Sequence, residues 1–181
     1  MRSYTRKVRD LTVFALLGAM MFLTKNAMAG LPLPNIHPLG LFIAAFTLAY
    51  RARALAPLYV YVMVDGAFWG FSMWWIPYLY IWLPLWGMFM LVGAAPAKKL
   101  PVKLKVLLCM FLCGLHGLSF GMLYVPAQAV MFGLNFNGMV AWIIAGLPFD
   151  IIHAVGNLAM GTLIIPLSEL LKKLDKQPNY P

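Results

Sequence analysis

Acidic residues are scarce in this 181-residue chain, which has only five Asp and Glu against fourteen Lys and Arg. Charged residues of both signs make up 10% of the sequence, whereas 63% of the residues are hydrophobic. Soluble domains usually carry about 25% charged residues, so this composition excludes a typical soluble domain. It leaves no room for a separate catalytic or nucleotide-binding domain. The net charge of +9 is therefore not the footprint of a nucleic-acid-binding surface.

Several motifs of catalysis and cofactor binding are also missing. The sequence has no HExxH or CxxC motif and no glycine-rich loop able to cradle a phosphate. Its two cysteines, Cys109 and Cys113, lie four residues apart in an apolar stretch. Buried cysteines usually behave as small hydrophobic residues, and a metal site would need more ligands nearby. We therefore expect neither an enzyme nor a protein with a metal or cofactor of its own.

The basic residues that are present form four short clusters. Thirteen of the fourteen belong to Arg2/Arg6/Lys7/Arg9, Arg51/Arg53, Lys98/Lys99/Lys103/Lys105 and Lys172/Lys173/Lys176. Cationic residues concentrate in cytoplasmic loops, and a helix needs about 20 apolar residues to cross the ~30 Å hydrocarbon core. Four inner clusters predict three helical hairpins. The expected fold is thus an all-α integral membrane protein with six transmembrane helices and both termini in the cytoplasm.

The pattern predicts one transmembrane domain over residues 1–181, with a basic segment at 1–10 and a tail at 172–181. We expect the six helices at 11–28, 39–50, 54–73, 78–92, 106–124 and 138–171, the last kinked at Pro148. The proline-rich segment 29–38, the turn 74–77 and the segment 125–137 are expected as outer connections, the last with helix over part of it as an alternative. The basic segment 96–105 is the expected inner loop.

Polar side chains inside membrane helices are costly and are therefore functional candidates. Asp150, His153 and Asn157 have spacings of three and four, which place them on one helix face. This face could form a hydrogen-bond network, with His116 as a further member, or the polar wall of a ligand pocket, and both interpretations stay open. A metal site of two His and one Asp is a third alternative. Asp65 is expected to pair with a buried donor.

The outer half of the predicted bundle is rich in aromatic and amide side chains. Aromatic rings also form belts at membrane interfaces, so a belt is the alternative to a binding site. An outward cleft lined by aromatic and a few polar groups is typical of a small-molecule site. The residues predicted to bind substrate are Lys25, Asn26, Asn35, His37, Trp69, Trp74, Trp75, Tyr78, Tyr124, Gln128, Asn135, Asp150 and His153.

Small residues in the first helix predict a contact with another helix. Ala15 and Ala19 are four residues apart, with Gly18 beside Ala19. Small side chains at this spacing let helices approach closely in lipid. We expect Ala15, Gly18 and Ala19 to form a partner-coupling surface.

As a whole, the chain resembles the substrate-binding S components of energy-coupling factor (ECF) vitamin transporters. The resemblance rests on its size, its six predicted helices with cytoplasmic termini, the proline-rich outer segment, and the pair Ala15/Ala19, which is similar to the AxxxA coupling motif of that family. The segments LPNIHPLGLFIAAFTLAYRARAL, WWIPYLYIW and FNGMVAWIIAGLPFDIIHAVGN look like those of S components from Gram-positive bacteria.

The resemblance implies a multi-pass protein of a bacterial cell membrane that binds a vitamin with high affinity near its outer loops. It would dock on the ECF transmembrane coupling protein, which two ABC ATPases drive, then topple and release the vitamin inside. ATP would be used by those partner ATPases. The cobalamin-specific branch is the most similar, so cobalamin is the predicted substrate, with riboflavin, pyridoxine, a pyrimidine or pantothenate as alternatives.

Two other classes of function compete with this interpretation. An intramembrane enzyme would use Asp150, His153 and His116 as acid, base or metal ligands, and it is disfavoured by the lack of a clear nucleophile. A stand-alone transporter or channel is disfavoured because no ring of like residues and no internal repeat is visible.

Overall fold

The computed structural model describes residues 2–30, 36–94 and 99–176, with side chains from Lys7 onward. Regular structure in this part of the chain is entirely helical, without a strand. A helix satisfies its own backbone hydrogen bonds, which is what a lipid environment requires. The elements, in chain order, are α1 (Arg2–Ala29), α2 (Leu39–Tyr50), the short 3-10 helix η1 (Arg51–Ala54), α3 (Leu55–Trp69), the 3-10 helix η2 (Ile76–Leu79), α4 (Leu83–Val92), α5 (Val102–Leu118), α6 (Phe120–Phe132), α7 (Phe136–Gly161) and α8 (Ile164–Asp175).

Four helical stretches of the described residues are long and apolar enough to cross a membrane. They are Lys7–Ala29, Leu39–Trp69, Val102–Phe132 and Phe136–Gly161, and a shorter apolar stretch covers Ile76–Val92. These stretches support a multi-pass, all-α membrane protein. Six separate crossings stay a prediction, because α2 has 12 residues and α4 has 10, so each extends for less than about 20 Å.

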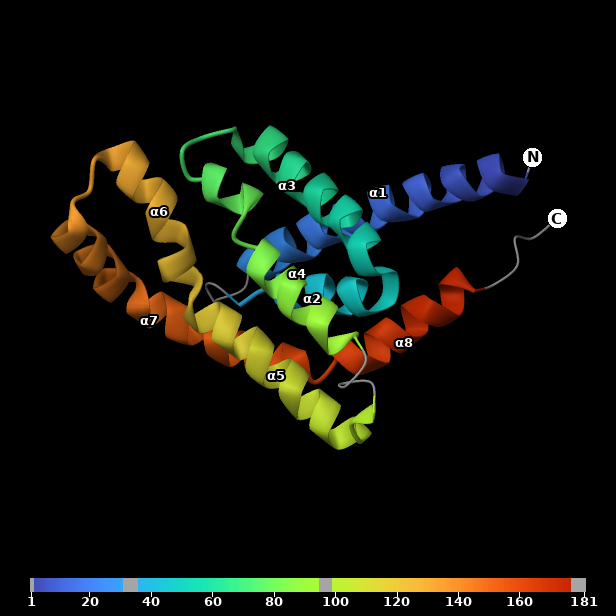
Figure 1. The fold of residues 1–181 in the computed structure, drawn as a ribbon. Coiled ribbons are helices and arrows are strands. Elements are labelled where there is room, and N and C mark those ends of the chain that lie inside the picture. Colours follow the sequence, from blue (N-terminus) through green and yellow to red (C-terminus); the bar gives the residue numbers. More distant parts are fainter. Residues whose placement is uncertain (1, 31–35, 95–98, 177–181) are drawn as a thin grey trace.

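The stretch Leu39–Trp69 is not one straight helix. Arg51 has φ 58°, the one positive φ at a described non-glycine residue. Figure 1 shows α2 and α3 meeting in a turn at this point, so that the chain folds back on itself. The basic pair Arg51 and Arg53 thus lies in a connection between two helices, as the cluster pattern predicts.

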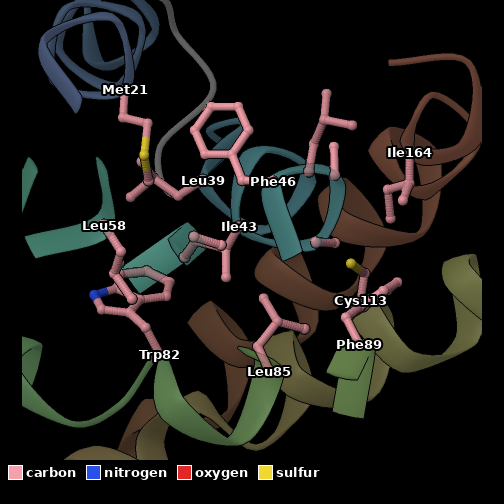
Figure 2. Packing of buried hydrophobic residues seen from close by; sticks show 14 of the residues in the cluster. Met21, Leu39, Ile43, Phe46, Leu58, Trp82, Leu85, Phe89, Cys113 and Ile164 are labelled. Carbon is pink, nitrogen blue, oxygen red and sulfur yellow. The ribbon is translucent and has the colours of Figure 1, made fainter. Parts of the chain in front are cut away.

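The central helix of the fold is α2, which contacts α4, α5, α7 and α8. Its residues Leu39, Ile43 and Phe46 are at most 2% exposed. Around them in Figure 2 lie side chains from the surrounding helices: Met21, Leu58, Trp82, Leu85, Phe89, Cys113 and Ile164. Burial of these groups fixes the position of α2, and a cavity forms near each of its two ends.

Both cysteines belong to this apolar interior. Cys109 and Cys113 are free thiols, and neither is more than 1% exposed. Their expected role as small hydrophobic residues is confirmed.

The start of α1 and the end of α8 lie toward the same end of the molecule (Figure 1). Arg9 of α1 pairs with Asp175 of α8 at 3.2 Å and with Asp10 at 3.1 Å. Arg53 of η1 pairs with Asp10 at 3.0 Å and with Asp175 at 3.4 Å. Two cations and two carboxylates therefore join the start of the chain, the α2–α3 turn and the end of α8. This arrangement is compatible with both termini on one side of a membrane.

Helix boundaries differ from the predicted ones in the second half of the chain. α5 begins at Val102, and α6 occupies most of the segment 125–137 predicted as a loop, so the alternative of partial helix there is correct. Gly133, with φ 63°, ends α6 in a left-handed conformation that glycine adopts without steric cost.

The predicted helix 138–171 is divided in the structure. α7 continues through Pro148 and ends at Gly161, and α8 is a separate helix. Pro166 explains the break, because a proline lacks the N–H that a continuous helix would need but fits in the first turn of a new one. The single kinked helix was therefore a wrong prediction.

Cysteine labelling tests the predicted orientation. Asn137 and Lys99 are both exposed, at opposite ends of the predicted topology. In intact cells Asn137→Cys should react with an impermeant maleimide, whereas Lys99→Cys should react only after the membrane is permeabilised. The native thiols are buried and should give little background. Strong labelling of Lys99→Cys in intact cells would contradict the predicted orientation.

Candidate ligand-binding site

A cavity of about 360 Å³ lies where the end of α1, the residues before α2, the loop before η2, and parts of α6 and α7 meet. We call it the aromatic cavity. It is lined by Lys25, Ala29, Ile36, His37, Trp74, Tyr78, Phe120, Gly121, Tyr124, Trp142, Gly146, Phe149, Asp150 and His153. Its volume lies within the usual range of small-molecule sites, about 300–1,000 Å³.

One wall of the aromatic cavity is a group of stacked rings. Trp74 and Trp142 stack with their ring centroids 5.8 Å apart, and Phe132 packs against both of them. The Tyr124 hydroxyl donates a hydrogen bond to the Trp74 carbonyl. Trp74 nevertheless keeps 54% of its surface exposed. A flat ligand could therefore stack on a ring that is already held in place.

Two imidazoles line the inner part of the cavity. The rings of His37 and His153 are 5.4 Å apart, and Phe120 lies 4.8 Å from the His153 ring. The Nδ1 atoms of both histidines are buried and have no hydrogen-bond partner among the described residues. His37 lies outside the apolar spans. Burial, with smaller contributions from His153 and Lys25, lowers the pKa of His37 to about 4, so this imidazole is neutral at physiological pH.

A carboxylate at the same wall is held by a backbone group. Both oxygens of Asp150 lie 3.1 Å from the Gly121 amide nitrogen, which donates to them. Gly121 also leaves the space that the carboxylate fills, because a Cβ there would lie 2.5 Å from Oδ2. Asp150 is only 4% exposed and forms no ion pair with any described cation. It supplies acceptor oxygens beside the two histidines.

An internal ion pair neutralises the one lysine of the cavity. Lys25 Nζ lies 2.6 Å from Asp65 Oδ1, and their side chains are 17% and 6% exposed. The ammonium group also lies 5.3 Å from the Tyr78 ring centroid and 5.9 Å from that of Tyr61. The expectation that Asp65 pairs with a buried donor is confirmed. An anionic ligand would have to compete with Asp65 for Lys25.

A second hollow of about 290 Å³ adjoins the aromatic cavity and shares Lys25, Trp74, Tyr78 and Tyr124 with it. The further predicted residues Asn26, Trp69 and Trp75 line this hollow. The Asn26 side-chain oxygen accepts a hydrogen bond from Trp69 Nε1 at 3.1 Å. Trp75 Nε1 donates to the Val62 carbonyl at 2.8 Å. Ten of the thirteen residues predicted to bind substrate thus lie around two connected hollows.

The remaining three predicted residues lie elsewhere. Asn35 lies outside the described residues. Asn135 caps the start of α7, where its side chain accepts from the Gly138 amide at 2.8 Å. Gln128 is fully buried in α6, and its amide group has no hydrogen-bond partner among the described residues. Neither Asn135 nor Gln128 lines either hollow.

The polar face of α7 has two different roles. Asp150 and His153 line the cavity, whereas Asn157 packs against Gly40 and Gly117, where a Cβ would lie 3.0 and 2.8 Å from its side chain. Its role in the structure is to brace α2 and α5 against α7.

His116 is separate from this group. Its Nε2 lies 2.8 Å from the Ile81 carbonyl, and its ring stacks on Trp82. Among the described residues no cluster of three or more His, Cys, Asp or Glu is placed to hold a metal ion. A metal site built from Asp150, His153 and His116 is therefore not present among the described residues.

Sequence reasoning missed Trp142, Gly146 and Phe149 as lining residues. Helical spacing could have located the first two. Trp142, Gly146 and Asp150 follow one another at intervals of four residues, which places them on one face of the helix. Gly146 is informative because a Cβ there would meet nothing within 4 Å. The missing side chain leaves part of the cavity open.

Residues 117–121, GLSFG, also have the GxSxG spacing of serine hydrolases. The prediction that catalytic motifs are missing did not take this match into account. That motif works on a sharp turn between a strand and a helix. Here Ser119 lies at the junction of α5 and α6, and its hydroxyl donates to the His116 carbonyl at 3.1 Å. Ser119 thus lies between two helices and not on the strand-to-helix turn of that motif.

The three residues of the expected partner-coupling surface differ from one another in burial. Ala15 is exposed and Ala19 is half-buried. Gly18 is buried against α3, where a Cβ would lie 2.5 Å from Val60 Cγ1. Gly18 thus serves the α1–α3 contact within the chain, while Ala15 keeps a surface that another helix could approach.

Comparison of the chain with protein-family models, curated proteins and solved structures found no match.

Proposed function

We propose that this protein is the substrate-binding subunit of an ECF-type vitamin importer in a bacterial cell membrane. The observation that carries the proposal is the aromatic cavity at one end of a multi-pass bundle. Its lining combines stacked tryptophan rings with two imidazoles whose Nδ1 atoms have no hydrogen-bond partner among the described residues. Such a lining can bind and orient a small molecule. Transport would then depend on the ECF coupling protein and its two ABC ATPases.

The cavity also favours one class of ligand. Trp74 and Trp142 offer a stacking surface, while His37, His153 and Asp150 add polar atoms to the same lining. The pair Lys25–Asp65 leaves little free positive charge for an anion. A volume of about 360 Å³ suits a neutral molecule of one to three rings, such as pyridoxine or a flavin. Cobalamin, the substrate predicted from the resemblance, would have to extend beyond the cavity through its open outer side.

The direct test is affinity purification of the tagged protein from its native membrane. Co-purification of a membrane coupling protein and two ABC ATPases would support the importer, and mass spectrometry of the eluate would identify a retained ligand. A purified protein that retains no partner and binds none of riboflavin, pyridoxine, pantothenate or cobalamin would contradict the proposal.

Filling the aromatic cavity should abolish binding without damage to the fold. In Gly146→Leu the new side chain occupies space that is empty in the wild type. We expect the affinity for the retained vitamin to fall at least about 10-fold, because the ligand would have to be packed into space that the leucine occupies. Stability should not fall, because leucine is a better helix former than glycine by almost 1 kcal/mol. Calorimetric titration and thermal unfolding in detergent measure the two effects.

Gly87→Leu is the matched control. Gly87 lies in α4, its Cβ position is also free of neighbours within 4 Å, and it does not line the aromatic cavity. This variant should bind like the wild type. Unchanged affinity in Gly146→Leu would place the binding site elsewhere.

A further inference from the structure

A second cavity, of about 450 Å³, lies at the other end of α2. We call it the basic cavity. His37 precedes α2 and belongs to the aromatic cavity, whereas Arg51 follows α2 and belongs to the basic one. The basic cavity is lined by Leu48, Ala49, Arg51, Val92, Gly93, Val102, Lys105, Ile165, Ser168, Glu169 and Lys172. These residues come from α2, η1, α4, α5 and α8.

The charge of this lining is positive. Arg51, Lys105 and Lys172 face one carboxylate, Glu169, so three cations and one anion leave a net charge of +2. Glu169 pairs with Lys172 at 2.9 Å, and this hydrogen bond is the main cause that lowers the pKa of Glu169 below its usual value. Arg51 and Lys105 form no ion pair with any described carboxylate. The cavity therefore offers an anion these two cations, and Lys172, beside its partner Glu169, adds to the positive charge.

The Arg51 guanidinium is only half used by the protein. Its Nη2 donates to the Met90 carbonyl near the end of α4 at 2.8 Å. Its Nη1 is buried and has no hydrogen-bond partner among the described residues. Gly93 makes room for this nitrogen, because a Cβ there would lie 1.8 Å from Nη1. A buried charged donor without an acceptor is costly unless a ligand supplies one.

The backbone at Arg51 supports the same conclusion. Its φ of 58° is a conformation that glycine would adopt at lower cost, and such strain is found mainly where a side chain is needed for function. The hydrogen bond to the Met90 carbonyl uses Nη2, whereas Nη1 has no partner among the described residues.

The remaining lining is mostly apolar, apart from Ser168, and reaches the end of the bundle where the basic clusters lie. Leu48, Val92, Val102 and Ile165 border the same cavity as the cations. A phosphate next to an apolar surface is the chemistry of a lipid headgroup above its acyl chains, and basic pockets between membrane helices bind such headgroups. We propose that the basic cavity binds the headgroup phosphate of an anionic membrane lipid through Arg51 Nη1, Lys105 and Lys172.

The test uses the full-length protein, stripped of lipid in a neutral detergent and titrated with phosphatidylglycerol while native mass spectrometry records the bound fraction. Lys105→Gln/Lys172→Gln should weaken binding about 10-fold or more, because each lysine near an anionic lipid contributes substantially to the attraction. These substitutions leave Arg51 and its bond to Met90 intact, so they avoid the folding defect that loss of Arg51 would cause.

Lys103→Gln/Lys173→Gln is the matched control, since it removes the same charge from exposed neighbours that do not line the cavity. It should change the affinity less than 3-fold. An equal loss in both double variants would overturn the proposal in favour of general surface charge. Equally tight binding of phosphatidylcholine would also overturn it, and displacement of the lipid by inorganic phosphate at the same concentration would overturn the lipid as the source of the phosphate.

Discussion

Lys25→Met should destabilise the protein by about 3–5 kcal/mol, the typical cost of removing one partner from a buried ion pair. Asp65 would be left with its carboxylate 6% exposed and without its cation, 2.6 Å away in the wild type. The midpoint of thermal unfolding in detergent should therefore fall by several degrees or more. Asp65→Asn should have a similar effect, because it leaves the ammonium group unpaired.

Two variants separate this effect from loss of a lysine in general. Lys25→Met/Asp65→Leu removes both charges and should recover most of the stability, because replacing a buried pair by apolar groups is often neutral. Lys172→Met breaks the exposed pair with Glu169, whose side chain is 58% exposed, and should cost less than about 1 kcal/mol. A wild-type midpoint in Lys25→Met would mean that Asp65 does not need this partner.

The second large effect concerns transport. In Ala15→Trp/Ala19→Trp, indole rings cover the small-residue surface of α1, so the close helix–helix approach that small residues allow in lipid is blocked. We expect vitamin uptake to be lost while binding by the purified protein stays within about 2-fold of the wild type. The aromatic cavity should be unaffected, because neither alanine lines it.

Ala159→Trp is the control for this experiment. Ala159 is an exposed alanine of α7, so the variant adds the same ring to another helix surface. Uptake should be normal in this control. Normal uptake by the α1 variant as well would remove the support for coupling through Ala15 and Ala19, and loss of binding together with uptake would indicate damage to the fold.

Much of the site follows from helical spacing and from the cost of polar groups in an apolar interior. Asp150 and His153 stand out in the sequence because they lie three residues apart in an apolar segment, and both line the cavity. The aromatic residues 74, 78 and 124 could be proposed from the same reasoning. The same reasoning was wrong for Asn135, because an amide side chain beside the start of a helix can cap the helix instead of facing a ligand.

The amino-acid sequence by itself determined that the chain is helical, that it is suited to a membrane, and that its basic residues gather at the ends of its helices. These properties depend on composition and on local periodicity, which are independent of how the helices pack. Only the tertiary structure decided that Lys25 pairs with Asp65, forty residues away, and that Gly18 packs against α3. It also decided that Arg51 has a buried nitrogen without a partner among the described residues. Contacts between distant residues depend on the positions of whole helices, and the burial of the α2 side chains sets those positions.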